Sequence, residues 1–513
     1  MPARRALLKR ATGKRIYERI VHFAYTGNNL RPQLTNVLAF AFPDHNIGRQ
    51  VIAMPLPHRN RGGIDAKKFV NLRLVAPIVF TCLFVSVLVV SATAMAAPPV
   101  PVSDQLNSVD RGIIEQMLKD AVEAVKKEYF DPNFGGANLN AAYAQARAAL
   151  AKANSVHEGY EAVANMLRQL DDSHTQFIPP QQPFTVDAGW SMALIGNKCF
   201  VTRVKHGSDA EAKGLKPGDE IIELENVKPS RANWEDLNYS INILAPRSSL
   251  HLVVVSPGEP QSKAITTKSV VKTRQKMYDL TNNEYWIAVH QEDQDWEKYE
   301  SREFMFADVQ IWQLRNFEFK EDALDSHLRK AEKAKAVIID LRGNPGGSVD
   351  VLTHMIGDFS TYEVQIAQTV KRDKSKPMTA KAGSHPYTGK LIVLVDSRSA
   401  SCSELFARVM QLEKRAIVIG DRTAGAVREA HIKSFVHGQG TVYAYDVEVT
   451  VADLKMSDGQ TLEKTGVVPD ETLLPTAQQL AAGEDPQLAR ALELAGVSVT
   501  AKKAGSLLPP QEN

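Results

Sequence analysis

The sequence predicts a multidomain chain whose largest part is an α/β domain, preceded by a helical region and a small inserted β domain. Three observations lead to this prediction. The 513 residues exceed one ordinary domain, the apolar periodicity changes along the chain from helical to strand-like, and buried strands later alternate with helices. Hydrophobic content of 44% and charged content of 23% are typical of a globular protein with sizeable cores.

The charge is unevenly distributed. Residues 1–73 hold 14 Lys/Arg against 3 Asp/Glu, whereas the whole chain holds 61 and 59, so the remainder is net acidic. An acidic body behind a basic leader argues against nucleic-acid binding by the folded part.

The basic leader has the order of a secretory signal. Lys67, Lys68 and Arg73 precede an uncharged apolar run at residues 74–90, and the A-M-A sequence at 94–96 fits a cleavage site. An uncleaved membrane anchor is the alternative, because the run is near the lower length limit for spanning a bilayer. Either reading predicts a periplasmic or extracellular protein, with membrane contact only through an uncleaved leader.

Residues 1–66 lie upstream of this signal peptide or anchor, which we assign to residues 67–97. We interpret them as a start codon placed too early, with Met54 as the true initiator, or as a disordered or long cytoplasmic leader.

Residues 98–183 are predicted to form an N-terminal helical region. Apolar side chains recur at helical spacing from Ile113 to Val125 and again from Ala142 to Leu150, and a third helix is expected to end near Leu170.

Residues 184–272 change to short β runs, at 199–204, 220–224 and 250–255. The first two runs flank the sequence G-L-K-P-G-D at 214–219, a turn in which glycine and proline suit the backbone. Cys199 in this region and Cys402 further on have no zinc-site spacing, so we expect both to be buried as small apolar residues. No metal or nucleotide motif appears, so no cofactor is expected.

A polar connection at 273–305 leads to an α/β domain at 306–475, followed by a C-terminal helix and tail at 476–513. Near-continuous apolar strands are predicted at 307–312, 336–340, 391–395 and 416–420, with a helix at 321–334. Such strands between helices indicate a sheet covered on both faces.

Four segments in and after these strands carry polar and glycine residues suited to chemistry. They are D-L-R-G-N-P-G-G at 340–347, S-R-S-A-S-C-S-E at 397–404, G-D-R-T-A-G-A at 420–426, and the stretch from Asp458 to Asp470. Glycines after a strand let backbone amides approach a reacting group, and a serine at a strand-to-helix turn is exposed.

These segments, in this order and behind the β domain, resemble the tail-specific (C-terminal processing) serine peptidase family, which includes tricorn-like proteases. The resemblance covers about residues 108–475. It implies a crotonase-like α/β catalytic domain and a PDZ-like inserted domain, which would bind an extended peptide at a sheet edge. The loop that holds the peptide's terminal carboxylate would lie near Gly189, Trp190, Ser191 and Met192.

The resemblance also implies the catalytic groups. Ser401, three positions before Glu404, would be the nucleophile. The oxyanion hole would use the backbone N–H groups of Cys402 and Gly347, with Gly346 as the alternative to Gly347.

The chain departs from the bacterial Ser–Lys pattern, because Ala426 stands where the catalytic lysine is expected. Tricorn-like members use a histidine with an adjacent serine and a distant glutamate instead. Ser173, His174 and Glu463 fall in the matching segments. Lysine-dependent relatives can also carry a D-x-H-T sequence, so His431 and Lys433 remain competing bases.

The function expected from these observations is that of an exported serine endopeptidase that cleaves proteins or peptides through an acyl-enzyme. Its PDZ-like domain would recognise substrate C-terminal tails. One alternative is a catalytically inactive PDZ scaffold that binds peptide C-termini, and another is ligand binding on the same fold. The sequence does not determine the oligomeric state.

Overall fold

The computed structural model describes residues 105–180, 184–273, 302–318, 327, 329–437 and 443–508. All of them belong to one compact unit, Ser103–Asn513. The expected leader and signal peptide, most of the 273–305 connection and half of the 321–334 helix lie outside the described residues. Within the described residues, every helix falls short of the length and apolar character needed to cross a membrane.

The centre of the catalytic part is a six-stranded sheet with the order β18-β15-β14-β11-β10-β9. Neighbours are parallel except for the β9–β10 hairpin. Its strands are β9 (Arg302–Phe306), β10 (Val309–Gln313), β11 (Ala336–Asp340), β14 (Lys390–Val395), β15 (Ala416–Gly420) and β18 (Glu471–Thr472).

One expected strand boundary was wrong. The sequence predicted a strand from Ala307, whereas Ala307 and Asp308 form the turn between β9 and β10 with φ of 47° and 63°. A tight hairpin turn needs positive φ at its central residues, and this requirement outweighs the apolar run that follows.

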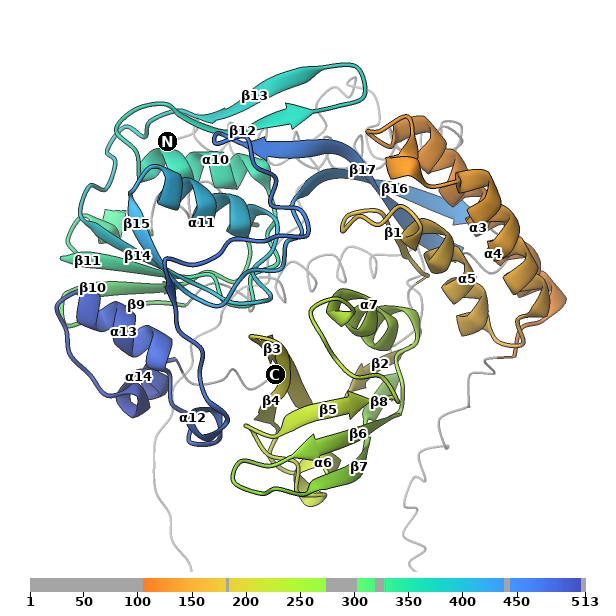
Figure 1. Ribbon diagram of the computed structural model, residues 1–513, viewed down its shortest axis with the longest axis horizontal. Helices are drawn as coiled ribbons and strands as arrows, with labels where there is room; N and C mark the ends of the chain where they lie inside the picture. The colour runs from red at the N-terminus through yellow and green to blue at the C-terminus, as the bar shows by residue number, and fades with distance from the viewer. Residues whose placement is uncertain are drawn as a thin grey trace, which may run out of the picture. The chain divides into compact units, whose positions relative to one another are not determined.

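Helices cover both faces of this sheet (Figure 1). α10 (Val349–Asp358) and α11 (Cys402–Leu412) pack on one face, where Val337, Ile339 and Val393 point. α13 (Pro486–Leu494) and α14 (Ala501–Leu507) cover the other face, against Ile338 and Ile392. Alternate residues of one strand thus reach opposite cores, which explains why these strands are apolar throughout.

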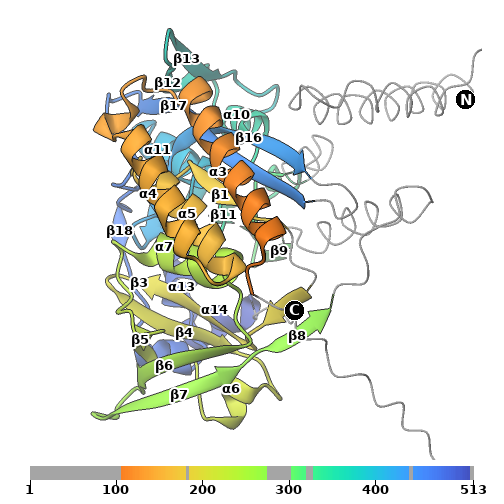
Figure 2. The same cartoon turned by 90° about the vertical axis from the view of Figure 1, so that its right-hand side faces the viewer.

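A second sheet joins the catalytic part to the N-terminal helices. Its order is β1-β17-β12-β13, and β16 also pairs with β17. The strands are β1 (Gln176–Ile178), β12 (Val364–Val370), β13 (Ser375–Ala380), β16 (Arg428–His437) and β17 (Tyr443–Met456). Figure 2 shows α3 (Ser108–Glu128), α4 (Leu139–Lys152) and α5 (Val156–Arg168) side by side, and their apolar faces share a core with β1 and β17.

The inserted β domain has its own core around Trp190, Leu224 and Leu252. Its sheet has the order β3-β4-β5-β6-β7, so β3 (Trp190–Ile195) is an edge strand. The other strands are β4 (Lys198–Val204), β5 (Glu220–Leu224), β6 (Ser249–Val255) and β7 (Ser262–Lys268), with helices α6 (Asp209–Ala212) and α7 (Trp234–Tyr239) and a separate β2–β8 ribbon (Phe184–Asp187 with Val270–Thr273).

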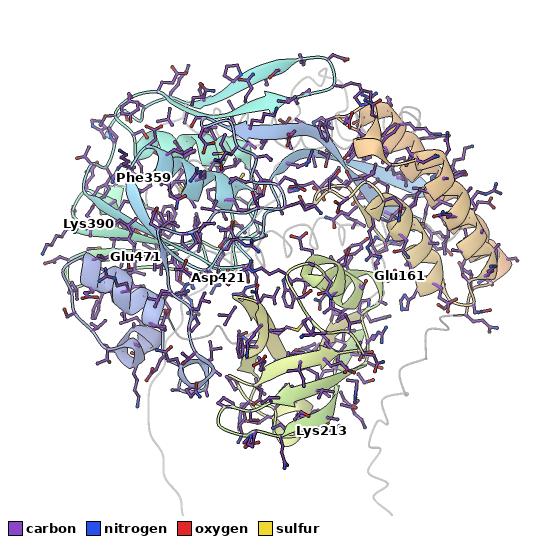
Figure 3. All side chains as sticks on the ribbon, viewed as in Figure 1. Glu161, Lys213, Phe359, Lys390, Asp421 and Glu471 are labelled. Atoms are coloured by element: carbon purple, nitrogen blue, oxygen red, sulfur yellow. The ribbon has the colours of Figure 1, made fainter. Side chains whose placement is uncertain are left out.

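Hydrogen bonds from two loops of the catalytic part hold the end of β3. Ser397 Oγ donates to the Leu194 carbonyl at 2.5 Å, and the Gly196 N–H donates to Asp421 Oδ2 at 2.7 Å. Arg231, just before α7, contacts the same Asp421 oxygen at 2.7 Å and donates to the Gly196 carbonyl at 2.8 Å. Figure 3 labels Asp421 where the β15 loop faces the β domain.

The loop between β14 and α11 is fixed by a buried carboxylate. Glu404, fully buried in the first turn of α11, accepts hydrogen bonds from the N–H groups of Ser401, Gly425 and Ala426 and from the Thr423 hydroxyl. Burial raises the pKa of Glu404 from its ordinary 4.5 to about 7, although these donors favour the ionised form and work against the rise.

The raised pKa of Glu404 predicts a pH-dependent free energy of unfolding. Between about pH 4.5 and 7 the folded protein holds a proton on Glu404 that the unfolded chain has released, so stability falls as the pH rises through this window. The contribution amounts to roughly 3 kcal/mol.

Urea unfolding of the wild type and of Glu404→Gln across this pH range measures the contribution of Glu404 to the free energy of unfolding. The stability advantage of the wild type over the variant should shrink by that amount from pH 4.5 to 7. Parallel pH profiles would contradict the prediction.

Candidate active site

Ser401 lies where two loops meet at the sheet's carboxyl edge. β11 and β14 are parallel neighbours, so the segments that follow them, starting at Leu341 and Asp396, lie side by side. Ser401 is partly exposed, and its N–H donates to the Ala426 carbonyl at 2.9 Å. Its φ of 53° and ψ of −117° are rare for a residue with a side chain, a strain that is concentrated at functional sites.

Gly346 approaches Ser401 closely, and both Gly346 and Gly347 have positive φ, of 105° and 141°. A Cβ on Gly346 would lie 2.7 Å from the Ser401 Cβ and 3.1 Å from the Cys402 nitrogen, so only glycine fits. The chain after β11 is therefore held against the serine and the start of α11.

The backbone N–H groups near Ser401 differ in whether they already have a hydrogen-bond acceptor. The Gly346 N–H donates to Asn344 Oδ1 at 2.8 Å, within its own turn. The bridge to Phe317 uses the Gly346 carbonyl and the Ser348 N–H, and does not use the Gly347 N–H. The Cys402 N–H belongs to the first turn of α11, where an amide has no acceptor within the helix. Of the two sequence alternatives, Gly347 fits an oxyanion hole with Cys402 better than Gly346 does.

Cys402, next to Ser401, is not a competing nucleophile. Burial raises the pKa of its thiol to about 12, so the thiol stays protonated at neutral pH. Its Sγ contacts the Gly347 carbonyl at 3.1 Å. Cys199 and Cys402 are both buried and unbridged, as the sequence predicted.

Ser173, His174 and Glu463 form a hydrogen-bonded chain. Ser173 Oγ lies 2.7 Å from His174 Nδ1 and donates to Glu463 Oε2 at 2.9 Å. Because a carboxylate only accepts, the hydroxyl hydrogen goes to Glu463, and Ser173 Oγ must accept from His174 Nδ1–H. This fixes the tautomer in which Nε2 carries the free lone pair, as a general base requires.

Glu463 is buried and connects this chain of hydrogen bonds to the Ser401 loop. It accepts from the Ser173 N–H at 3.0 Å and from the Val427 N–H at 3.0 Å, and Arg428 Nε lies 3.7 Å from its Oε1. Val427 directly follows Ala426, whose carbonyl accepts the Ser401 N–H. The histidine and the serine are therefore anchored on the same short segment.

Lys433 and His431, the competing candidates for the base, contact other side chains, and so does Lys464. Lys433 Nζ lies 2.7 Å from Glu128 on α3, and His431 Nδ1 lies 3.7 Å from the same side chain. Lys464, next to Glu463, pairs with Asp171 at 3.0 Å. Burial lowers the pKa of Lys464, but Asp171 raises it more, so the amine stays protonated.

The predicted peptide-binding residues lie at the start of edge strand β3. Gly189 has a φ of 72° and its carbonyl accepts from the Lys205 N–H, while Ser191 and Met192 are half-buried on the edge strand. The Trp190 ring is buried, and its indole N–H donates to Thr267, so this side chain supports the core of the β domain. The four residues thus come together, with Trp190 in a structural position.

A polar hollow of about 260 Å³ joins this β domain to the catalytic loops. Leu194 and Trp234 line it from the β domain, and Ser397, Gly425 and Asp172 line it from the catalytic side. The hollow is therefore bounded by the loops that carry the Ser401 and His174 networks.

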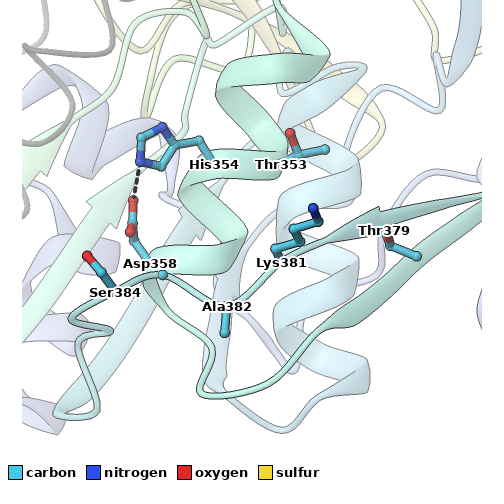
Figure 4. A pocket seen from close by; sticks show the side chains of 8 residues that line it. Thr353, His354, Asp358, Thr379, Lys381, Ala382 and Ser384 are labelled. Carbon is cyan, nitrogen blue, oxygen red and sulfur yellow. Dashed lines mark ion pairs between the residues drawn. The ribbon is translucent and has the colours of Figure 1, made fainter.

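A larger hollow, about 530 Å³, lies elsewhere, between α10 and the segment after β13 (Figure 4). His354 and Asp358 on its wall form an ion pair at 3.2 Å, and Lys381 stands opposite. None of the predicted catalytic residues lines it. In the part of the chain that the structure describes, no three His, Cys, Asp or Glu side chains are grouped so as to hold a metal ion.

Asp172 is a residue near the base that the sequence reasoning left without a role. Its carboxylate accepts from the N–H groups of His174 and Thr175, the two residues that follow Ser173. The sequence D-S-H-T contained a signal, because Asp commonly bonds backbone amides two and three residues onward.

Comparison with known proteins identifies both main parts of the chain. Residues 308–473 match the model of Peptidase family S41, and residues 184–255 match the PDZ domain model. The carboxyl-terminal-processing protease of Synechocystis sp. PCC 6803 is 23% identical over 411 residues, which cover 76% of this chain and 89% of that protein. The carboxy-terminal processing protease CtpA of Bacillus subtilis is 24% identical over 321 residues, which cover 60% and 62%.

Among solved structures, mature CPAF aligns with a TM-score of 0.54 at 13% identity over 73% of this chain and 95% of that one, a likeness of fold. The expected α/β catalytic domain and PDZ domain both fit these matches. Together with the carboxyl-terminal-processing relatives, they show a serine-type peptidase. The matches to Peptidase family S41 and to the PDZ domain, with these relatives, support a tail-specific, PDZ-containing serine peptidase.

Proposed function

We propose that this serine endopeptidase cleaves peptide bonds by attack of Ser401, with His174 as the general base and Ser173 and Glu463 as the groups that orient it. The observation that carries the proposal is the hydrogen-bonded chain from Glu463 through Ser173 to His174 Nδ1. It leaves His174 Nε2 as the proton acceptor in a chain that has alanine at position 426.

In this mechanism, Ser401 Oγ attacks the scissile carbonyl while its proton passes to His174 Nε2. The oxyanion of the tetrahedral intermediate accepts hydrogen bonds from the backbone amides of Gly347 and Cys402, at the N-terminus of α11. The imidazolium then protonates the leaving amine, and water hydrolyses the acyl-enzyme by the same groups. The ionised Glu463, reached through Ser173, stabilises the imidazolium.

The PDZ domain would select substrates by their C-terminal tails. A peptide that adds antiparallel to edge strand β3 places its terminal carboxylate near Gly189 and runs toward Leu194. The Leu194 carbonyl contacts Ser397, which lies on the same loop as Ser401. The scissile bond would therefore lie several residues before the bound tail.

We further propose an exported enzyme, periplasmic or extracellular, on the strength of the leader composition at residues 67–97. The inactive PDZ scaffold is the second candidate, favoured only by the missing lysine at position 426. The crotonase-like assignment of the catalytic domain remains a prediction.

Replacement of the proposed nucleophile and base tests the mechanism. Ser401→Ala should abolish both peptide hydrolysis and labelling by a fluorophosphonate probe, and His174→Ala should lower kcat about 10³-fold or more. Ser173→Ala should cost less, because His174 remains present but loses its link to Glu463. His431→Ala is the matched control and should retain near wild-type rates, since its ring faces Glu128.

Activity retained in Ser401→Ala would refute the nucleophile. A wild-type protein that neither labels nor hydrolyses would favour the scaffold alternative.

Tail recognition predicts a preference for free carboxyl termini. A peptide with a free C-terminus should be cleaved with kcat/KM at least about tenfold above that of the same peptide as a C-terminal amide, because the amide removes the charge that the Gly189 loop would hold. Fluorophosphonate labelling, which needs no tail, is the control for an intact active site. Equal kcat/KM values for the two peptides would contradict recognition by the carboxylate.

A further inference from the structure

Asp172 is the hub of a hydrogen-bond network on the opposite side of the His174 loop from Glu463. Its Oδ1 accepts from the His174 N–H at 2.9 Å and from the Thr175 N–H at 2.8 Å. Its Oδ2 accepts from Thr175 Oγ1 at 3.0 Å. One carboxylate thus fixes the main chain of the base and of the residue after it.

The hub is anchored on two elements distant in sequence. Thr450 on β17, fully buried, donates its hydroxyl to Asp172 Oδ1 at 2.8 Å and its N–H to Thr175 Oγ1 at 3.1 Å. Tyr129, buried at the end of α3, faces the same carboxylate. Burial, then the charge of Asp172 and a hydrogen bond to it, raise the pKa of Tyr129 far above its ordinary value, so its hydroxyl remains a donor.

The two sides of the loop have separate tasks. Glu463 binds the N–H and the hydroxyl of Ser173, and through this hydroxyl it sets the Nδ1 side of the imidazole. Asp172 binds the N–H groups on which the position of the His174 Cα depends. An imidazole with a correct Nδ1 contact still misses Ser401 if its main chain shifts, and a shift of about 1 Å can cost about 10²-fold in rate.

The neighbouring charged side chains Glu448 and Arg428 do not share the contacts that Asp172 makes with the His174 loop. Glu448 on β17 is another carboxyl near His174. Burial raises its pKa, and its Oε2 accepts from Gln176 at 2.7 Å. Arg428 lies toward Glu463 and over the Phe130 ring, at 4.7 Å from the ring centroid. Neither side chain has a hydrogen bond to the His174 or Thr175 amides in the described contacts.

We propose that Asp172 is a positioning residue that fixes the main chain of the general base relative to Ser401, by linking the His174 loop to Thr450 on β17. This rests on the proposed role of His174.

Substitutions that distinguish the loss of the Asp172 contacts from a general loss of stability test the proposal. Asp172→Ala should lower kcat and the rate constant of fluorophosphonate labelling about 100-fold, while KM changes by no more than about threefold. Asp172→Asn keeps an oxygen for the two amides and should recover most of the lost rate, to within about tenfold of the wild type.

Asp120→Ala is the matched control. Asp120 on α3 is a buried carboxylate that accepts from Gln116, His437 and Tyr445, none of which lies on the His174 loop. This variant should lower the thermal midpoint at least as much as Asp172→Ala, yet label at the wild-type rate when measured below its unfolding transition.

The outcomes are distinguishable. Three results would each refute the positioning role of Asp172 while His174 remained essential. They are labelling at the wild-type rate by Asp172→Ala, an Asp172→Asn variant as slow as Asp172→Ala, and an equal loss of labelling rate in Asp120→Ala. Normal labelling by His174→Ala, measured in parallel, would instead overturn the proposed base and the role of Asp172 with it.

Discussion

Two buried carboxylates hold three consecutive backbone amides, and the arrangement of the site depends on them. Glu404 accepts from the N–H groups of Gly425 and Ala426, and Glu463 accepts from the next one, on Val427. Glu404 also binds the Ser401 N–H, and Glu463 binds Ser173. Because buried polar groups must be satisfied by hydrogen-bond partners, the segment between them cannot shift without leaving a buried carboxyl oxygen or N–H group unsatisfied.

This constraint explains how the site accommodates alanine at position 426. The Ala426 backbone still links Glu404 to Ser401 through its N–H and its carbonyl, so the segment keeps its structural task without a basic side chain. The proton acceptor then has to come from another loop. An imidazole suits the role of proton acceptor, because its pKa in water lies near neutrality. An amine must first be strongly desolvated to act as a base.

The PDZ domain contacts the catalytic part at the point where its edge strand ends. Ser397 and Asp421 bind the main chain of Leu194 and Gly196, and Arg231 adds a charged contact to Asp421. Both loops that make these contacts continue toward the Ser401 region, one to Ser401 itself and one to Ala426. The end of edge strand β3 and the segments around Ser401 and Ala426 are therefore held by the same two loops.

The sequence by itself determined what short patterns encode. The apolar strands ending at Asp340 and Val395 and the serine before an apolar helix led to the prediction of Ser401 as the nucleophile. These features are local, and a parallel sheet brings the ends of its strands together. The resemblance also pointed to Ser173, His174 and Glu463, although Ser173 and Glu463 are 290 residues apart in the sequence.

Only the tertiary structure decided their contacts. The tautomer of His174 and the contact of Asp172 with Thr450 both depend on groups supplied by elements distant in the sequence. Periodicity and spacing describe a side chain's own strand or helix, so they cannot specify which far segment satisfies a buried polar group.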